Sequence, residues 1–275
     1  MDDDRRHFLR AAAAALAASP WLGANAQTGV DTPHPHDMSQ MPASWTGKEQ
    51  IGMVMYPGMT ALDFVGPQYM FASLLGATVH HVAADMKPVK CDTQISLLPT
   101  ATFSQVPENL DILFVPGGGA GTITAMQDAS LLRFVAEHGR RAKWVTSVCT
   151  GSLVLGAAGL LTGYRATSHW VTTPLLAEVG AIADKSRVVR DRNRITGAGV
   201  SAGLDLGLTL VGILRDTLYA ETVQLLAEYA PQPPYNAGTP RTAPPEAKAM
   251  LDDMFKEFNP MARAAIRKSP GGGAS

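Results

Sequence analysis

Short apolar runs alternate with longer stretches of helical pattern between residue 50 and about residue 230. The runs at 51–56, 112–115 and 144–148 are each followed within three residues by a glycine. Apolar runs of this length that end at turn residues are typical of buried strands. These three runs therefore predict the central strands of a sheet.

The segments between and after these runs predict the other elements. We expect a strand at 78–84, a hairpin across 89–98, and helices at 61–75, 131–141, 151–161, 201–214 and 219–229. Buried strands that alternate with helices predict an α/β fold, in which helices cover both faces of a mostly parallel sheet. One domain at 48–230 accounts for this whole pattern.

The N-terminal segment has the order of parts found in an export signal. Arg5 and Arg6 precede a mild apolar stretch at 11–18, and Ala24-Asn25-Ala26 supplies the small residues of a cleavage site. This order predicts a twin-arginine signal peptide at 1–26, and therefore a periplasmic or secreted product. An alanine-rich helix of the mature protein is the alternative.

Polar and proline-rich segments flank the predicted domain. Residues 27–47 are interpreted as a linker. Its His34, His36 and Met38 could bind a soft metal ion, but without further ligands at spaced positions a solvated linker is the favoured interpretation. Residues 231–275 form a proline-rich extension that contains a helix at about 246–266. We expect this extension to wrap around the domain or to pair with another copy.

The composition of the chain excludes several classes of protein. The chain has 275 residues, with 23 Lys and Arg against 24 Asp and Glu, so its formal net charge is −1. This balance opposes a nucleic-acid binder or a membrane-surface protein held by basic residues, and no stretch is apolar over the length of a membrane span. Two cysteines are too few for a disulfide scaffold or a four-cysteine zinc site.

One of the two cysteines lies where parallel sheets place their ligands. Cys149 follows the run 144–148 directly, and a predicted helix begins at Gly151. A residue on a sharp turn from strand to helix points into the crevice at the carboxyl ends of the strands. The N-terminus of the helix would favour a thiolate there. A buried structural cysteine is the alternative.

Two other predicted strands end in residues that suit the same crevice. Gly117, Gly118 and Gly119 follow one strand, and their N–H groups could bind negative charge that develops on a substrate. Asp63 follows another strand, where a nearby thiolate would keep it protonated and able to act as an acid. The alternatives are a simple glycine turn and a helix-start aspartate.

Together these segments resemble the ThiJ/PfpI superfamily, the relatives of Parkinson disease protein 7, and within it the isonitrile hydratase branch. The segments that carry the resemblance are 56–58, 63–67, 115–119, 147–151, 156–163, 165–170 and 199–205. The resemblance covers about residues 50–230. It implies a flavodoxin-like three-layer sandwich, as in class I glutamine amidotransferases, and a homodimer.

The resemblance also implies a role for each candidate residue. Cys149 corresponds to the nucleophile, Asp63 to the acid that replaces a glutamate of other members, and Thr150 to the threonine after the cysteine. Because position 150 is not histidine, amide hydrolysis by a Cys–His pair is disfavoured. We interpret His169 as a hydrogen-bonded core histidine and Asp205 as a helix anchor.

The implied reaction is hydration of a small isonitrile to an N-substituted formamide. Cys149 would form a thioimidate while Asp63 supplies a proton, and water placed by Asp63 or Thr150 would then release the product. The N–H groups of Gly118 and Thr150 would stabilise negative charge. No metal or organic cofactor is needed.

Three alternatives stay open at the level of sequence. Similar domains form the sensor half of AraC-family regulators, but the residues after Ala230 leave no room for the DNA-binding region of such a regulator. An exported ligand-binding or redox-sensing domain is a second alternative, because a cysteine at a helix start can be oxidised reversibly. A glyoxalase or deglycase is the third.

Cys91 and Cys149 are expected to be free.

Overall fold

The computed structural model describes residues 41–272. The predicted signal peptide at 1–26 and linker residues 27–40 lie outside the described residues. Of the described residues, those from Ser44 onward form one compact unit. The end of the predicted linker is therefore part of the domain: the Trp45 indole donates to Asp216 Oδ2 (2.7 Å), and Arg215 pairs with Glu49.

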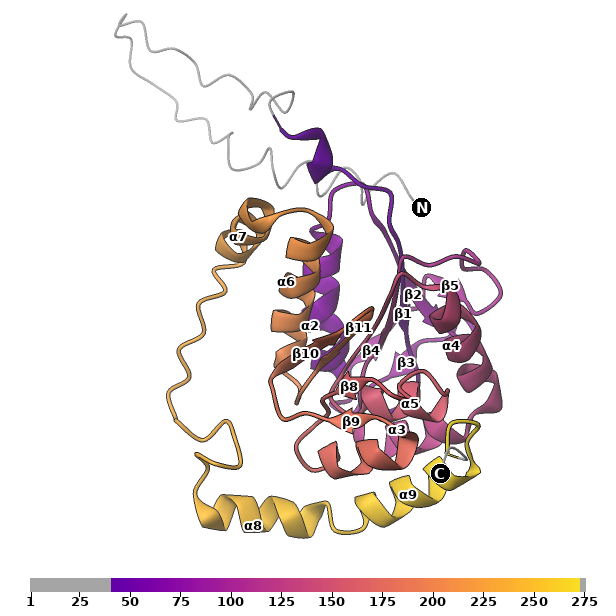
Figure 1. The fold of residues 1–275 in the computed structure, drawn as a ribbon, viewed down its shortest axis with the longest axis vertical. Coiled ribbons are helices and arrows are strands. Elements are labelled where there is room, and N and C mark those ends of the chain that lie inside the picture. The colour runs from indigo at the N-terminus through magenta and orange to yellow at the C-terminus, as the bar shows by residue number, and fades with distance from the viewer. Residues whose placement is uncertain (1–40, 273–275) are drawn as a thin grey trace, which may run out of the picture. The chain divides into compact units, whose positions relative to one another are not determined.

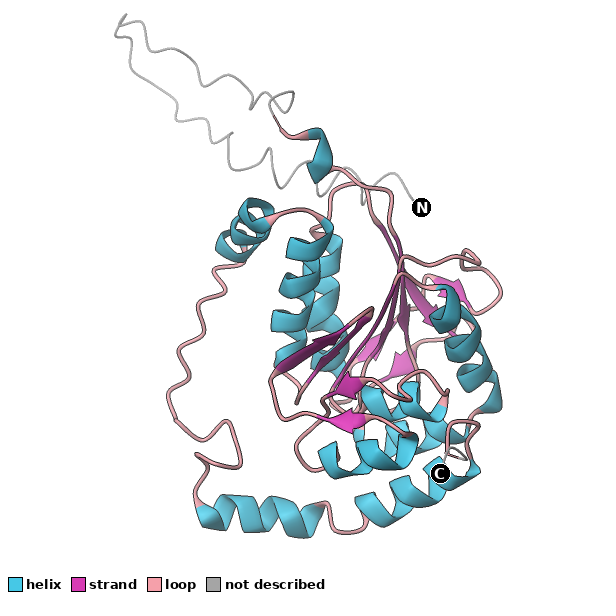
Figure 2. Cartoon of the chain, viewed as in Figure 1, coloured by secondary structure: helices cyan, strands magenta, loops and turns pink. Residues whose placement is uncertain are grey.

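A seven-stranded sheet forms the centre of this unit (Figures 1 and 2). The strands in spatial order are β10 (Val188–Asp191), β11 (Arg194–Gly197), β7 (Trp144–Val148), β6 (Ile112–Val115), β1 (Gln50–Val54), β2 (Thr78–Ala83) and β5 (Ala101–Thr102). All neighbouring pairs are parallel except β10–β11. The predicted fold class is confirmed.

Helices cover both faces of the sheet. Figure 1 shows α2 and α6 on one face and α3, α4 and α5 on the other. The helices are α2 (Ala61–Ala72), α3 (Gly119–Gln127), α4 (Ala129–Arg141), α5 (Gly151–Ala157), α6 (Ala202–Leu214), α7 (Thr217–Leu226), α8 (Pro245–Met254) and α9 (Phe258–Lys268), with 3-10 turns η2 (Ala43–Trp45) and η3 (Thr173–Val179). None of the described helices is both long and apolar enough to cross a membrane.

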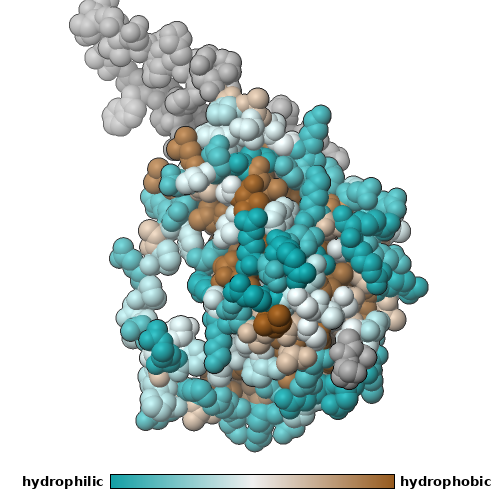
Figure 3. All heavy atoms as spheres, viewed as in Figure 1, coloured by the Kyte–Doolittle hydropathy of each residue, from teal (hydrophilic) through white to brown (hydrophobic). Residues whose placement is uncertain are grey.

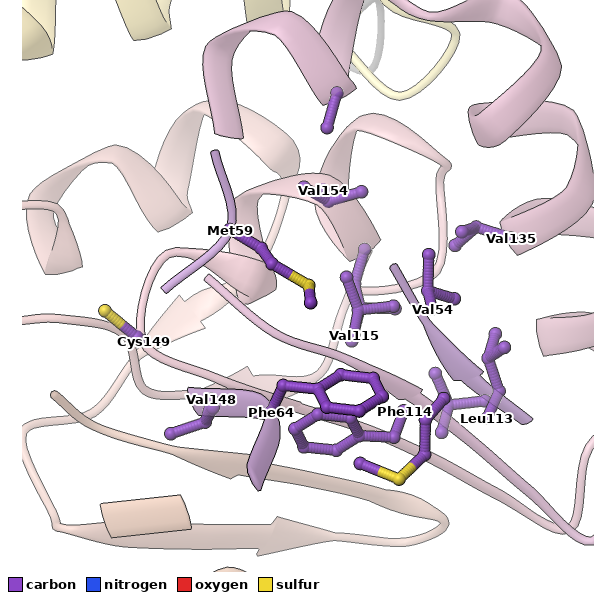
Figure 4. Close-up of a cluster of buried hydrophobic side chains, with 14 of the residues drawn as sticks. Val54, Met59, Phe64, Leu113, Phe114, Val115, Val135, Val148, Cys149 and Val154 are labelled. Carbon is purple, nitrogen blue, oxygen red and sulfur yellow. The ribbon is translucent and has the colours of Figure 1, made fainter. Parts of the chain in front are cut away.

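The central strands are buried on both faces, as parallel strands between two helical layers must be. All four residues of β6 have no exposed surface. Figure 4 shows how Phe114 and Val115 of this strand pack with Phe64 of α2. This packing fixes the carboxyl ends of β1, β6 and β7 next to one another, because these strands are neighbours in the order β7–β6–β1.

Four short strands lie outside the main sheet. They form two pairs: β3 (Val89–Lys90) with β4 (Ser96–Leu97), which is antiparallel, and β8 (Arg165–Ala166) with β9 (Ile182–Ala183), which is parallel. The β3–β4 pair is the predicted hairpin at 89–98.

Several elements differ from the sequence prediction, which included no strand for β5, β8 or β9 and no turn for η3. The glycine-rich segment after β6 forms α3 instead of a simple turn, and 188–197 adds the edge pair β10–β11. The C-terminal helix predicted at 246–266 is two helices. Its second half, α9, is packed through Phe258, Ala262, Ala265 and Ile266, whereas α8 has no buried residue.

Candidate active site

Cys149 lies on the sharp turn between β7 and α5. Its φ of +56° falls in the left-handed region that residues with a Cβ rarely adopt. The surrounding backbone holds this conformation: its N–H donates to the carbonyls of Gly197 (3.1 Å) and Ala198 (2.7 Å). Its own carbonyl accepts from the hydroxyls of Ser168 (3.0 Å) and Ser152 (3.2 Å). The geometry is that of a nucleophile elbow.

The sulfur of Cys149 is at the border of the core. Cys149 is 6% exposed, and Figure 4 shows its sulfur pointing away from the rings of Phe64 and Phe114. The backbone N–H groups of Thr150 and Val200 interact with this sulfur. Two backbone donors therefore lie beside the thiol, and little of the residue reaches solvent.

Asp63 faces the same point from the first turn of α2. It is fully buried, and its Oδ2 accepts the Gly117 N–H (2.9 Å). Its Oδ1 is buried without a well-formed hydrogen bond. The Cys149 thiol lies near enough to act on this carboxyl group, through a weak hydrogen bond and a Coulomb interaction. The structure thus brings together the two residues that the sequence placed on different strand ends.

Burial dominates the protonation of both groups. It raises the pKa of Asp63 to about 7, although the Gly117 N–H and the thiol act in the opposite direction. Burial and the negative charge of Asp63 raise the pKa of Cys149 well above its usual range, against the N–H groups of Thr150 and Val200. Burial therefore acts against the thiolate that the helix N-terminus favours. As the pH rises, Asp63 therefore loses its proton before Cys149 does.

The Thr150 side chain is part of a buried chain of hydroxyl groups. Its Oγ1 accepts the Gly118 N–H (3.0 Å) and lies 2.7 Å from Thr122 Oγ1, which lies 3.3 Å from the Tyr56 hydroxyl. The single Tyr56 hydroxyl proton is donated to the Pro116 carbonyl (2.7 Å), so Tyr56 accepts from Thr122. Thr122 in turn accepts from Thr150. Thr150 therefore donates into the protein, and placement of water by its hydroxyl stays a prediction.

Two residues of this hydroxyl chain were missed by the sequence analysis. Thr122 lies on α3, which the glycine-rich sequence does not predict, so no pattern pointed to it. Tyr56 follows a predicted strand, which indicated burial but gave no partner for its hydroxyl. Burial raises the pKa of Tyr56, so its hydroxyl keeps its proton.

Two of the three glycines after β6 use their N–H groups to bind other residues of the site. The N–H groups of Gly117 and Gly118 already donate to Asp63 Oδ2 and Thr150 Oγ1. Gly119 is exposed at the start of α3. These two N–H groups thus fix the acid and the threonine, and an oxyanion site at Gly117, Gly118 and Gly119 stays a prediction.

Among residues 41–272, no three His, Cys, Asp or Glu side chains gather closely enough to hold a metal ion. His34 and His36 of the predicted linker lie outside the described residues. The chemistry of the site is that of one thiol and one carboxyl group, surrounded by backbone N–H donors.

The chain matches the model of the DJ-1/PfpI family over residues 49–212. The chain belongs to the DJ-1/PfpI family. It is 48% identical to isonitrile hydratase of Pseudomonas putida over 211 residues, which cover 77% of this chain and 90% of that protein. A crystal structure of a ThiJ/PfpI family protein from Pseudomonas syringae superposes with a TM-score of 0.80 at 51% identity, covering 90% of this chain and 97% of that one.

A regulator is also among the relatives of this DJ-1/PfpI domain. The HTH-type transcriptional regulator GbdR of Pseudomonas aeruginosa is 30% identical over 173 residues. The alignment covers 60% of this chain and 46% of the regulator. The sequence-based resemblance to the superfamily is confirmed.

His169 and Asp205, which the sequence analysis assigned structural roles, both contact neighbouring side chains. His169 is half-buried beside Phe255 (5.8 Å between ring centres), its Nδ1 accepts the Val171 N–H (3.4 Å), and burial lowers its pKa. Asp205 binds Arg187 Nε (2.8 Å) and accepts the Tyr229 hydroxyl (3.1 Å). Both cysteines are free, as expected.

Replacing Gly117 by alanine is expected to disturb the site more than replacing Gly119. A Cβ at Gly117 would lie 2.6 Å from Thr150 N and 2.7 Å from Asp63 Oδ2, whereas a Cβ at Gly119 meets nothing within 4 Å. Overpacking of this kind costs about 1–3 kcal/mol. We expect G117A to melt at a lower temperature and to alkylate at Cys149 with altered kinetics. G119A serves as the matched control, and equal melting temperatures in both variants would contradict the account.

Proposed function

We propose that this DJ-1/PfpI domain hydrates isonitriles to N-substituted formamides. The observation that carries the proposal is the buried Cys149–Asp63 pair, in which the partner of the elbow cysteine is a carboxyl group and the adjacent position 150 is threonine. The 48% identity to isonitrile hydratase of Pseudomonas putida supports the choice of substrate. A carboxyl group whose pKa is about 7 suits transfer of a proton in both directions near neutral pH.

The first half of the reaction forms a bond between sulfur and the isonitrile carbon. Asp63, as carboxylate, takes the thiol proton of Cys149 and delivers it to the terminal carbon of R–N≡C. The sulfur electron pair forms the S–C bond, and the product is the thioimidate Cys149–S–CH=N–R. The N–H groups of Thr150 and Val200 stabilise the sulfur while it carries negative charge.

The second half adds water and breaks the S–C bond. Water attacks the thioimidate carbon while Asp63 takes one of its protons and passes it to the nitrogen. The tetrahedral adduct Cys149–S–CH(OH)–NH–R then collapses: the S–C electron pair returns to sulfur, and the hydroxyl proton leaves to the Cys149–Asp63 pair. The sum is R–NC plus H₂O giving R–NH–CHO, with the enzyme unchanged.

The pH dependence of kcat/KM follows from the proton held by this pair. Below pH 7 both Asp63 and Cys149 are protonated, so no base takes the thiol proton. We expect kcat/KM to rise as the pH increases through about 7, where Asp63 loses its proton. Initial rates between pH 5 and pH 9 measure this rise in kcat/KM. A profile that is flat over this range would contradict the assignment.

Product analysis with a panel of substrates separates this function from the alternatives. The chain without the predicted signal peptide (residues 27–275, here called the mature chain) is incubated with cyclohexyl isonitrile, methylglyoxal or glutamine. The products are identified by mass spectrometry. The proposal requires N-cyclohexylformamide as the product. Turnover of methylglyoxal instead would support a glyoxalase or deglycase, and a peroxide-dependent mass gain on Cys149 without turnover would support a redox sensor.

We also propose that the chain acts as a homodimer. Leu62, Val65 and Tyr69 lie on one side of α2 at helical spacing, and each is more than 40% exposed. Figure 3 shows further hydrophobic side chains over α6 and α7. An unpartnered apolar face of this kind is typical of a surface that a second copy covers. Sedimentation of the mature chain is expected to give twice the monomer mass; a single monomeric species would contradict the proposal.

Export by the twin-arginine pathway stays a proposal that rests on the sequence. The segment that carries it lies outside the described residues. Fractionation of cells that express the full chain is expected to place the processed protein in the periplasm or the medium. Replacing Arg5 and Arg6 by lysine is expected to retain it in the cytoplasm, and unchanged export of that variant would contradict the proposal.

A further inference from the structure

The β3–β4 hairpin is joined to the turn that begins α2. Gly58 N–H donates to the Lys90 carbonyl (2.8 Å), and Asp92 N–H donates to the Met59 carbonyl (3.0 Å). In return, Ala61 N–H donates to Asp92 Oδ1 (3.2 Å). The hairpin therefore contacts the backbone on both sides of the point where the strand–turn segment becomes a helix.

Asp92 provides the cap that α2 lacks locally. Thr60 occupies the N-cap position, but its side chain makes no capping hydrogen bond. The N–H groups of a first helical turn have no partner within the helix, so a side-chain oxygen or water must accept them. Asp92, 31 residues away in sequence, accepts the first of them. Its carboxylate also complements the positive end of the helix dipole.

The same helix end holds Asp63, two residues beyond Ala61. The two carboxyl groups have opposite surroundings: Asp63 has no exposed surface, whereas Asp92 is exposed. Two carboxyl groups at one helix end favour a proton on the one that is worse solvated. The negative charge of Asp92 contributes to raising the pKa of Asp63, after burial, which is the larger cause.

We propose that Asp92 is a positioning residue for Asp63: from the β3–β4 hairpin it caps the first turn of α2 and places a second carboxyl group at the helix end that holds Asp63 against Cys149. The kinetic part of this inference rests on the proposed function. The effect of Asp92 on the Cys149–Asp63 pair does not rest on the proposed function, because this effect is present in the protein without substrate.

The other ionisable groups that act on this pair are known from the structure. Asp63 is in contact with Cys149 from the β7–α5 turn, and the Asp63 charge also acts on Tyr56 of the segment after β1. Tyr56 keeps its proton because burial raises its pKa. Asp92 is therefore the group whose neutral replacement changes the charge near Asp63 while the pair itself stays intact.

The test uses three variants of the mature chain. Asp92→Asn keeps an oxygen that accepts the Ala61 N–H but removes the charge, whereas Asp92→Ala removes both. Asp128→Asn is the matched control: Asp128 is exposed and caps α4 through Ser130 N–H (2.9 Å), so the same substitution occurs at another helix start.

The measurement is the rate at which iodoacetamide alkylates Cys149 between pH 5 and pH 9. Peptide mass spectrometry separates Cys149 from Cys91. In the parent protein we expect the rate to rise with an inflection near pH 7, where Asp63 becomes able to take the thiol proton. In Asp92→Asn the inflection moves to lower pH in a protein that stays folded over this pH range, because the like charge is gone. In Asp128→Asn it stays in place.

Asp92→Ala distinguishes positioning from charge. It is expected to show the same lowered inflection and, in addition, a loss of about 10- to 100-fold in kcat/KM, since a displaced α2 moves Asp63 away from the sulfur. An inflection in Asp92→Asn at the parent value, or an equal shift in Asp128→Asn, would overturn the inference. A shifted inflection in a protein that turns over no isonitrile would instead support this inference and contradict the proposed function.

Discussion

Replacing Cys149 by serine is expected to abolish the formation of formamide, with a loss of about 10⁴-fold or more in kcat/KM. Serine fits the same turn, because the backbone hydrogen bonds that hold its φ of +56° do not involve the side chain. Its hydroxyl, however, is a much weaker acid than a thiol, so Asp63 cannot remove its proton to an equal extent. Product formation from cyclohexyl isonitrile measures the loss.

Cys91→Ser is the matched control for this variant. Cys91 is also buried and free, but it lies in the turn after β3. We expect it to retain activity within about twofold of the parent protein, since the residue is outside the reacting pair. A Cys149→Ser protein that folds and keeps activity within about tenfold of the parent would contradict a nucleophilic role for Cys149.

Replacing Asp63 by asparagine is expected to lower activity and raise stability in the same variant. Loss of a proton-transfer group costs about 10²- to 10⁴-fold in rate. Asparagine still accepts the Gly117 N–H through its oxygen, and its NH₂ group replaces the buried Oδ1 that lacks a well-formed hydrogen bond. The variant therefore keeps the local hydrogen bond while it removes a buried charge.

The gain in stability depends on pH in a defined direction. The pKa of Asp63 rises from 3.8 in the unfolded chain to about 7 in the folded one, so the folded protein binds more protons between these values. The free energy of unfolding of the parent protein therefore falls as the pH rises from 4 to 7, by at most about 4 kcal/mol. Asp63→Asn removes this fall.

Urea unfolding of both proteins at pH 5 and pH 8 measures the difference. We expect Asp63→Asn to be more stable than the parent at pH 8, with a smaller difference at pH 5. A variant whose advantage is the same at both pH values would show that Asp63 does not carry the buried charge. The result does not depend on which substrate the protein uses.

The sheet and the location of the site could be predicted from the sequence. The strands at 112–115 and 144–148 have the predicted bounds, because apolar runs that end at glycine-containing turns leave few alternative boundaries. The strand ends also placed Asp63 and Cys149 in one crevice, since neighbouring parallel strands end at the same edge of a sheet. This geometry follows from topology alone.

The electrostatics of the site could not be predicted in the same way. The sequence shows a helix start after Cys149, which favours a thiolate, but the opposing cost depends on how completely α2 and the strand ends exclude water. The partners of the Gly117 and Gly118 N–H groups likewise depend on side chains from distant segments. Asp92, 31 residues from the backbone group it caps, is a third example: no local pattern indicates a cap from another element.

The covalent bond between Cys149 and substrate is the central claim, and a rapid-quench mass spectrum tests it directly. Protein in excess over cyclohexyl isonitrile is quenched in the millisecond range and digested. The account predicts that the peptide containing Cys149 gains the full mass of the isonitrile, and that this gain decays as N-cyclohexylformamide appears. If N-cyclohexylformamide appears while the Cys149 peptide stays unmodified at every quench time, the covalent mechanism is contradicted.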